Sequence, residues 1–143
     1  MLSNKIKNAL NEQIQKEAYA SNAYLSLATW CEEKNLDGIA EYFYAASADE
    51  RNHMLEIYKY LNTYGGSAHI KPLKDTVIKQ KNLLEVFNYV FELEHDVTIS
   101  INKLAKLTYE ENDFATFKFL EAFVLEQQQS EKGVNELIDM IKR

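Results

Sequence analysis

The stretch GGSAHIKPLKDTVIKQK, residues 65–81, decides how the rest of the chain is connected. It contains Pro72, the only proline, and its apolar residues do not recur at the spacing of three and four that marks a helix face. A segment of this length is too long for a tight turn between helices and long enough to run along a whole helix. We therefore predict an extended crossover between two helical halves.

The half before the crossover predicts two helices. Apolar side chains recur with the helical period over about residues 3–34, where Ser3 is the expected N-cap, and again over about residues 37–64. Gly65 and Gly66 then form the expected C-terminal cap. The apolar stripe of the first helix consists of Ile6, Leu10, Ile14, Leu25 and Ala28.

The half after the crossover predicts two more helices, over about residues 82–111 and 113–142. The short breaks within each half make its two helices antiparallel, whereas the crossover makes the second and third helices parallel. The 143 residues, 46% of them hydrophobic, suit one all-α domain over residues 1–143. The predicted fold is an antiparallel four-helix bundle with one long crossover between the second and third helices.

Net charge and cysteine content exclude some classes of partner and of metal site. The net charge of −6 argues against a nucleic-acid or anionic-membrane partner and permits cations as ligands. Cys31 is the only cysteine, which excludes a thiolate metal centre within one chain and suits a reducing compartment. The sequence has neither a long apolar segment nor an apolar leader, so we expect a cytoplasmic protein without membrane contact.

Polar residues within the apolar stripes form the candidate site, because a buried charge without a partner is costly. Glu17 and Tyr24 face inward from the first helix, and Glu50 and His53 form an inward E-x-x-H pair on the second. Two ligands on adjacent turns of one helix can bind a single ion. On the third helix, Glu94 takes an apolar slot, while the alternative E-x-x-H pair of residues 92–95 faces more outward.

On the fourth helix, Gln127 follows the stripe, with Glu126 and Ser130 near its edge. Each of the four helices thus contributes an inward oxygen ligand or hydrogen-bonding group, and one helix adds an imidazole. Such a set suits Fe(II), Mn(II) or adventitious Zn(II), and one bridging carboxylate can hold two ions. A lone inward glutamate would be an ordinary core-edge residue, but the joint pattern favours a metal site.

The segments that carry these residues resemble the ferritin family, in particular its non-heme bacterial ferritins, over essentially the whole chain. They are NEQIQKEAYASNAY (11–24), DERNHM (49–54), FELEH (91–95) and FLEAFVLEQQQSEK (119–132). The resemblance implies a ferritin-like fold and a di-iron centre at which Fe(II) is oxidised to Fe(III) by O2 or peroxide. It also implies self-association into a hollow shell of 24 subunits that stores ferric mineral.

The resemblance assigns roles to the candidate residues. The matching ligands are Glu17, Glu50 and His53 for the first iron site and Glu50 and Glu94 for the second, with Tyr24 and Gln127 beside the centre. Weaker candidate ligands are Asp49, Glu126 and Ser130, of which Asp49 and Glu126 match transient ligands. Together these residues predict a ferroxidase centre built within one subunit.

Three departures from the family pattern refine the expectation. Gln129 and Ser130 stand where many bacterial ferritins have further glutamates, which argues against a third iron site. Arg51 stands where bacterioferritins carry their heme-ligating methionine, so no heme is expected. The sequence ends at Arg143, where ferritins usually continue into a short fifth helix, and we expect four helices.

Two other functions stay open from the sequence. One is a non-catalytic ferritin-like structural or modulating subunit whose site has decayed. The other is a DNA-protecting ferritin relative with twelve subunits. Metal content separates the first from a ferroxidase, and native mass separates the second.

Overall fold

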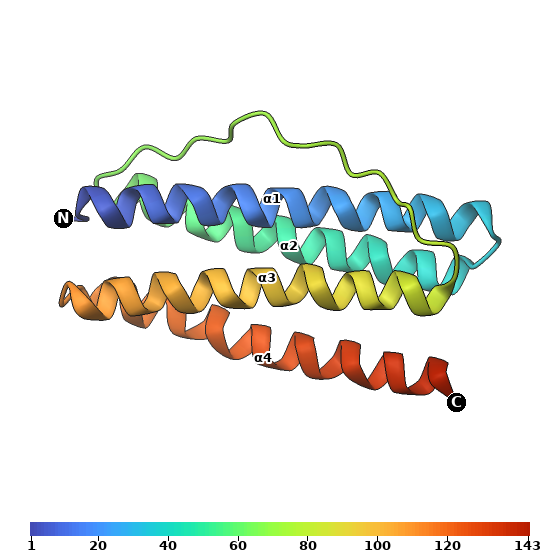
Figure 1. Cartoon of the computed structure of the whole chain (residues 1–143). Coiled ribbons are helices and arrows are strands. Elements are labelled where there is room, and N and C mark those ends of the chain that lie inside the picture. The colour runs from blue at the N-terminus through green and yellow to red at the C-terminus, as the bar shows by residue number, and fades with distance from the viewer. The chain divides into compact units, whose positions relative to one another are not determined.

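The computed structural model describes residues 1–143 and contains four helices and no strand. The helices are α1 (Asn4–Glu33), α2 (Asp37–Thr63), α3 (Leu83–Glu110) and α4 (Phe114–Lys142) (Figure 1). Each begins and ends within one residue of the prediction, because the helical period and the breaks between stripes are both strong in this sequence. None of the helices has the length and apolar character needed to cross a bilayer.

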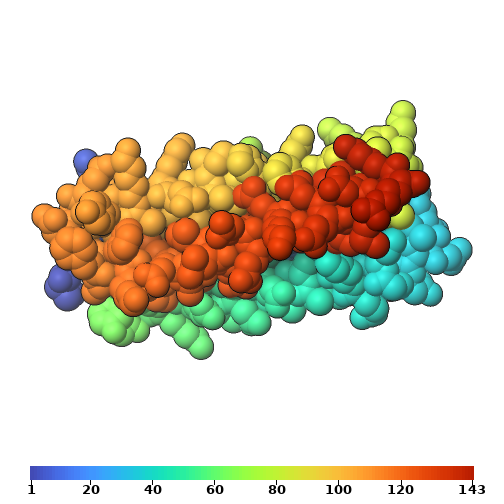
Figure 2. All heavy atoms as spheres, turned by 90° about the horizontal axis from the view of Figure 1, so that it is seen from below, coloured from blue at the N-terminus to red at the C-terminus, as the bar shows by residue number.

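The chain forms two compact units, Met1–Lys79 and Gln80–Arg143. In the first unit α1 packs along α2, and in the second α3 packs along α4, as the short breaks predict. In Figure 2 the side chains of α3 and α4 lie next to one another along the helix pair. Each unit is therefore a helical hairpin with its own inward faces.

Local capping explains where the helices begin. The Ser3 hydroxyl accepts a hydrogen bond from the Ile6 amide at 3.2 Å, which confirms the predicted N-cap of α1. Asn82 caps α3 in the same way, since its side-chain oxygen accepts from the Glu85 amide at 2.9 Å. Asp113 caps α4 through the Thr116 amide at 3.1 Å. Each side chain satisfies a backbone donor that has no partner within its helix.

The end of α2 also follows the prediction. Gly65 adopts a φ of 99°, a left-handed conformation that favours glycine. The Gly66 amide then donates to the Leu61 carbonyl at 2.9 Å, closing the last turn. The chain leaves the helix at this point and enters the crossover.

The inward face of α1 differs from the predicted stripe at one residue. Ile6, Leu10, Ile14 and Ala28 are buried as predicted, but Leu25 is 43% exposed, so its place in the stripe was wrong. Leu25 is rotated by about 100° from the buried Tyr24, since each helical residue turns by that angle. Its hydrophobicity alone does not place it on the packed face.

The crossover, residues 66–81, contains neither helix nor strand, as predicted. Asn11 binds it twice, by donating to the Ser67 carbonyl at 3.1 Å and accepting from the His69 amide at 2.9 Å. Gln15 accepts from the Lys71 amide at 3.0 Å, one turn further along α1. Polar side chains of α1 thus hold this segment. The segment runs along α1 in Figure 1.

Candidate metal centre

Three potential metal ligands converge between α1 and α2. Glu17 comes from α1, and Glu50 and His53 come from adjacent turns of α2. Their ligand atoms all lie within 4.8 Å of one another. The Nδ1 atom of His53 is 3.9 Å from Glu17 Oε2 and 3.7 Å from Glu50 Oε2. These separations leave room for an ion that all three side chains could contact.

Both carboxylates of this cluster are buried. Glu17 is 2% exposed and Glu50 is 5% exposed, while His53 is partly accessible. The pKa of Glu17 is raised well above its ordinary value by burial and by the neighbouring Glu50, with smaller opposing effects from Gln13 and His53. Glu17 Oε2 is fully buried and accepts no hydrogen bond. A cation at the cluster would satisfy this oxygen, so the residues present fit a bound metal.

Glu17 has a second buried neighbour that our sequence analysis missed. Gln13 lies four positions earlier on α1, and its Nε2 donates to Glu17 Oε1 at 3.0 Å. A signal was available, because residue 13 continues the buried series of Ile6 and Leu10 toward Glu17. A buried polar residue in that series needs a polar partner, and Glu17 lies one helical turn further along the same face.

Tyr24 is buried on α1, two turns after Glu17. Its ring stacks on Phe43 of α2 with centroids 6.0 Å apart and an interplanar angle of 21°. This contact fixes the ring against the second helix of the same unit. The inward orientation predicted for Tyr24 is confirmed by its burial.

The second unit contains the other two principal candidates. Glu94 on α3 and Gln127 on α4 are both buried, and Gln127 Nε2 lies 3.1 Å from Glu94 Oε2. The same nitrogen lies 3.1 Å from the Glu94 carbonyl and 3.2 Å from the hydroxyl of Thr98. The amide of Gln127 therefore holds one carboxylate oxygen of Glu94 between α3 and α4.

The weaker candidates lie further out. Asp49 and Glu126 are exposed, and Ser130 is half-buried. Among the alternatives on α3, residues 92 and 95 are both exposed, which agrees with their predicted outward orientation. His95 Nδ1 lies 3.2 Å from Glu131 Oε1, an ion pair when the imidazole is protonated. The first-unit cluster of residues 17, 50 and 53 is the group whose side chains could together hold a metal ion.

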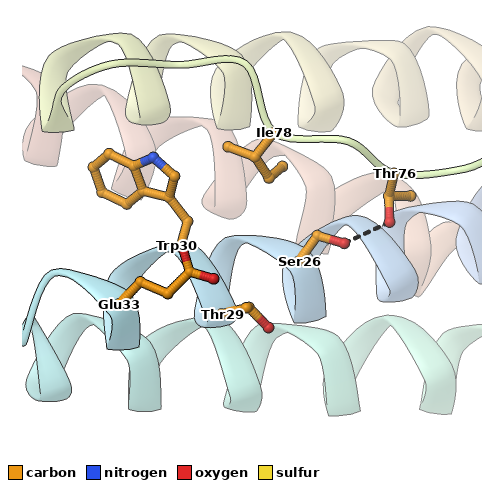
Figure 3. Close-up of a pocket in the computed structure, with 6 residues that line it drawn as sticks. All are labelled: Ser26, Thr29, Trp30, Glu33, Thr76 and Ile78. Carbon is orange, nitrogen blue, oxygen red and sulfur yellow. Dashed lines mark hydrogen bonds between the residues drawn. The ribbon is translucent and has the colours of Figure 1, made fainter.

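An open groove indents the first unit away from these residues. It is lined by Ser26, Thr29, Trp30, Glu33, Thr76 and Ile78 (Figure 3). The hydroxyls of Ser26 and Thr76 are hydrogen-bonded across it, joining α1 to the crossover. None of the candidate ligands lines this groove.

Comparison with known proteins shows the family to which the chain belongs. The model of the ferritin-like domain family matches residues 7–143. The chain belongs to the ferritin-like family. This ferritin-like chain is 37% identical to the bacterial non-heme ferritin of Campylobacter jejuni, over 99% of its own length and 85% of the relative. It is 35% identical to a probable bacterial non-heme ferritin-like protein of Haemophilus influenzae, over 99% and 86% of the two chains.

Solved ferritin structures match the whole ferritin-like chain. A ferritin of Chlorobium tepidum has a TM-score of 0.96 and 30% identity, and the match covers 99% of this chain and 87% of that one. An open-pore ferritin from the archaeon Archaeoglobus fulgidus also has a TM-score of 0.96, at 27% identity over 99% and 87% of the chains. The predicted ferritin-like all-α fold is therefore confirmed.

Proposed function

We propose that this ferritin-family protein stores iron and is a ferroxidase, which binds Fe(II) as substrate at Glu17, Glu50 and His53 and oxidises it to Fe(III). The observation that supports this most directly is the convergence of two buried carboxylates and one imidazole, with Glu17 Oε2 lacking a hydrogen-bond donor. Oxygen ligands with one imidazole suit Fe(II), and two carboxylates favour the more highly charged Fe(III) product. Membership of a family whose members include non-heme ferritins points to iron rather than another metal.

The proposed centre holds two iron ions. Glu17, Glu50 and His53 bind the first ion, and Glu50 bridges to a second ion that Glu94 also binds. Gln127 orients Glu94, consistent with the 3.1 Å separation between the amide nitrogen and the carboxylate. The family resemblance supports joining the two ligand sets into one centre. It also supports treating residues 1–143 as one domain.

The oxidation step transfers one electron from each of two Fe(II) ions to the oxidant. With O2, two electrons and two protons yield one H2O2; with H2O2, two electrons and two protons yield two water molecules. In this proposal Tyr24 lies beside the centre and donates a hydrogen bond or an electron there, and its stacking on Phe43 supports a fixed position for the ring. Asp49 and Glu126 would serve only as transient ligands while iron moves, and Ser130 is a weaker candidate ligand. No heme takes part in this proposal.

Storage requires an enclosed volume that a single chain of 143 residues does not provide. We therefore include self-association of identical chains into a hollow shell of 24 subunits, in the cytoplasm, with ferric mineral inside. The acidic balance of the chain suits an interior that attracts iron cations. Neither nucleic acid nor membrane is a partner in this proposal.

An aerobic Fe(II) oxidation assay tests the catalytic part. Glu50→Ala combined with His53→Ala should slow the initial rate by at least about 100-fold, because the double variant loses two of three ligands of the first ion. Glu56→Ala is the matched control, since Glu56 lies on the exposed face of the same helix and should leave the rate unchanged. A double variant as fast as the wild type would exclude the assignment.

Metal content and native mass separate the alternatives. A ferroxidase shell should load many ferric ions per chain and have the mass of 24 chains. A decayed, non-catalytic subunit would retain only adventitious metal, and a DNA-protecting relative would have the mass of twelve chains. Native mass spectrometry before and after aerobic iron loading gives both quantities in one experiment.

A further inference from the structure

We propose that Gln13 is a positioning residue for the metal ion: its side-chain amide fixes one oxygen of Glu17 and so directs the other oxygen toward the ion. This inference rests on the proposed function, because it concerns how the Glu17–Glu50–His53 cluster holds its substrate. It adds a residue that is not among the matched iron ligands. The supporting observations come from α1 and α2 of the first unit.

The two oxygens of Glu17 have different surroundings. Oε1 accepts a 3.0 Å hydrogen bond from Gln13 Nε2. Oε2 accepts no hydrogen bond and lies 3.9 Å from Nδ1 of His53. The amide therefore holds the carboxylate by one oxygen while the other faces the remaining ligands. A carboxylate held in this way is ready to bind an ion through Oε2 without a change of rotamer.

The residue type suits this role. Gln13 is 1% exposed in a series where Ile6 and Leu10 are also fully buried, so an apolar residue would fill the position. A buried amide is favourable only where its polar groups find partners. A lysine or arginine could also donate to Glu17, but its charge would neutralise the carboxylate and repel the metal. A neutral amide orients Glu17 and leaves its negative charge for the cation.

The second unit pairs the same two residue types, although there the glutamine and the glutamate lie on different helices. Gln127 Nε2 lies 3.1 Å from Glu94 Oε2, and both side chains are buried. In each helical hairpin, then, one glutamine amide holds one oxygen of a buried glutamate. A buried glutamine bonded to a buried glutamate thus occurs in both units. This supports a functional reason for the pair, since core packing alone would not require a polar pair in each unit.

Cobalt(II) binding to the full-length protein tests the proposal without turnover. Gln13→Met keeps nearly the same volume and removes the donor. We expect Co(II) affinity to fall about 10-fold or more, as is typical when an outer-shell partner of a ligand is lost, and the visible Co(II) bands to shift. In Fe(II) oxidation, the KM for Fe(II) should rise more than kcat falls. Gln128→Met, at an exposed position of α4, is the matched control and should change none of these values.

The outcomes distinguish this proposal from the proposed function. Gln13→Met with wild-type helicity, Co(II) affinity and spectrum would overturn the role of Gln13 and leave the metal site standing. A lower melting temperature with an unchanged Co(II) spectrum would indicate core packing only and would also overturn it. If His53→Ala bound Co(II) as tightly as the wild type does, both proposals would be overturned.

A crystal structure of the wild-type protein loaded with Co(II) supplies a second test that does not depend on a variant folding. The anomalous signal should place the ion against Glu17 Oε2, with Oε1 still within hydrogen-bond distance of Gln13 Nε2. Binding through Oε1, or a broken Gln13–Glu17 hydrogen bond, would contradict the proposal. No ion at the cluster would contradict both proposals.

Discussion

Ser21 of α1 and Ser47 of α2 hydrogen-bond to each other reciprocally inside the first unit. The Ser21 hydroxyl donates to the Ser47 carbonyl at 2.9 Å, and the Ser47 hydroxyl donates to the Ser21 carbonyl at 2.8 Å. Ser21 lies one turn after Glu17, and Ser47 lies one turn before Glu50. The pair therefore fixes the register of the two helices at the level where their carboxylates meet.

Ser47→Ala should destabilise the metal-free protein by about 1–3 kcal/mol, because the Ser21 carbonyl loses a buried donor. The measurement is urea unfolding of the metal-free protein at fixed protein concentration. Thr63→Ala is the control, since Thr63 also donates to a backbone carbonyl of α2 but at an exposed position. Its effect should stay within about 0.5 kcal/mol. Equal effects of the two substitutions would show that the buried pair does not set the register.

Metal binding should strengthen as the pH rises. Burial, together with Glu50, raises the pKa of Glu17 above its ordinary value of 4.5, so Glu17 keeps its proton to a higher pH than an ordinary glutamate, and a metal ion must displace that proton there. Below the raised pKa, binding releases this proton and the apparent affinity falls about tenfold per pH unit per proton. Calorimetric titration with Co(II) in buffers of different ionisation enthalpy measures the release. Glu17→Gln should weaken binding and abolish this pH dependence, whereas pH-independent wild-type affinity would contradict the prediction.

The stability of the metal-free protein should fall over the same pH range. A folded-state pKa above the unfolded-state pKa means that the folded chain binds the proton more tightly. The stabilising contribution of Glu17 is therefore fully present below about pH 4.5 and is lost as the pH rises through the folded-state pKa. Glu17→Gln removes this loss and should stabilise the metal-free protein by about 1–3 kcal/mol at high pH. Urea unfolding of wild type and variant across the pH range measures this difference. An equal loss of stability in both proteins as the pH rises would contradict the predicted role of Glu17.

If the proposed centre holds two ions, Gln127→Leu should act selectively on the second ion. The substitution removes the amide donor that lies 3.1 Å from Glu94 Oε2. We expect affinity for the second ion to fall about 10-fold or more, with the first ion bound as tightly as in the wild type. Anaerobic Fe(II) titration resolves the two binding steps, and Gln128→Leu serves as the exposed control. Equal weakening of both steps would argue against separate roles for the two ligand sets.

The sequence alone determines the helices and the inward faces on which the principal polar candidates lie. The helical period places Glu17, Glu50, Glu94 and Gln127 in apolar slots, and all four are buried. Capping residues predict the helix ends for a similar reason, since a cap satisfies backbone groups within a few positions of itself. These properties depend on neighbours along the chain. Sequence analysis reaches them without knowledge of the other helices.

Only the tertiary structure decides which atoms meet across helices. The 3.9 Å separation of Glu17 Oε2 from His53 Nδ1 depends on the register and rotation of α1 against α2. The exposure of Leu25 depends on the same rotation of α1 against α2, and the pattern of apolar residues does not predict that rotation. The hydrogen bond from Gln13 to Glu17 needs a side-chain rotamer that packing selects. The period of a helix defines its inward face, whereas the geometry of the candidate metal site arises from how that face packs against its partner.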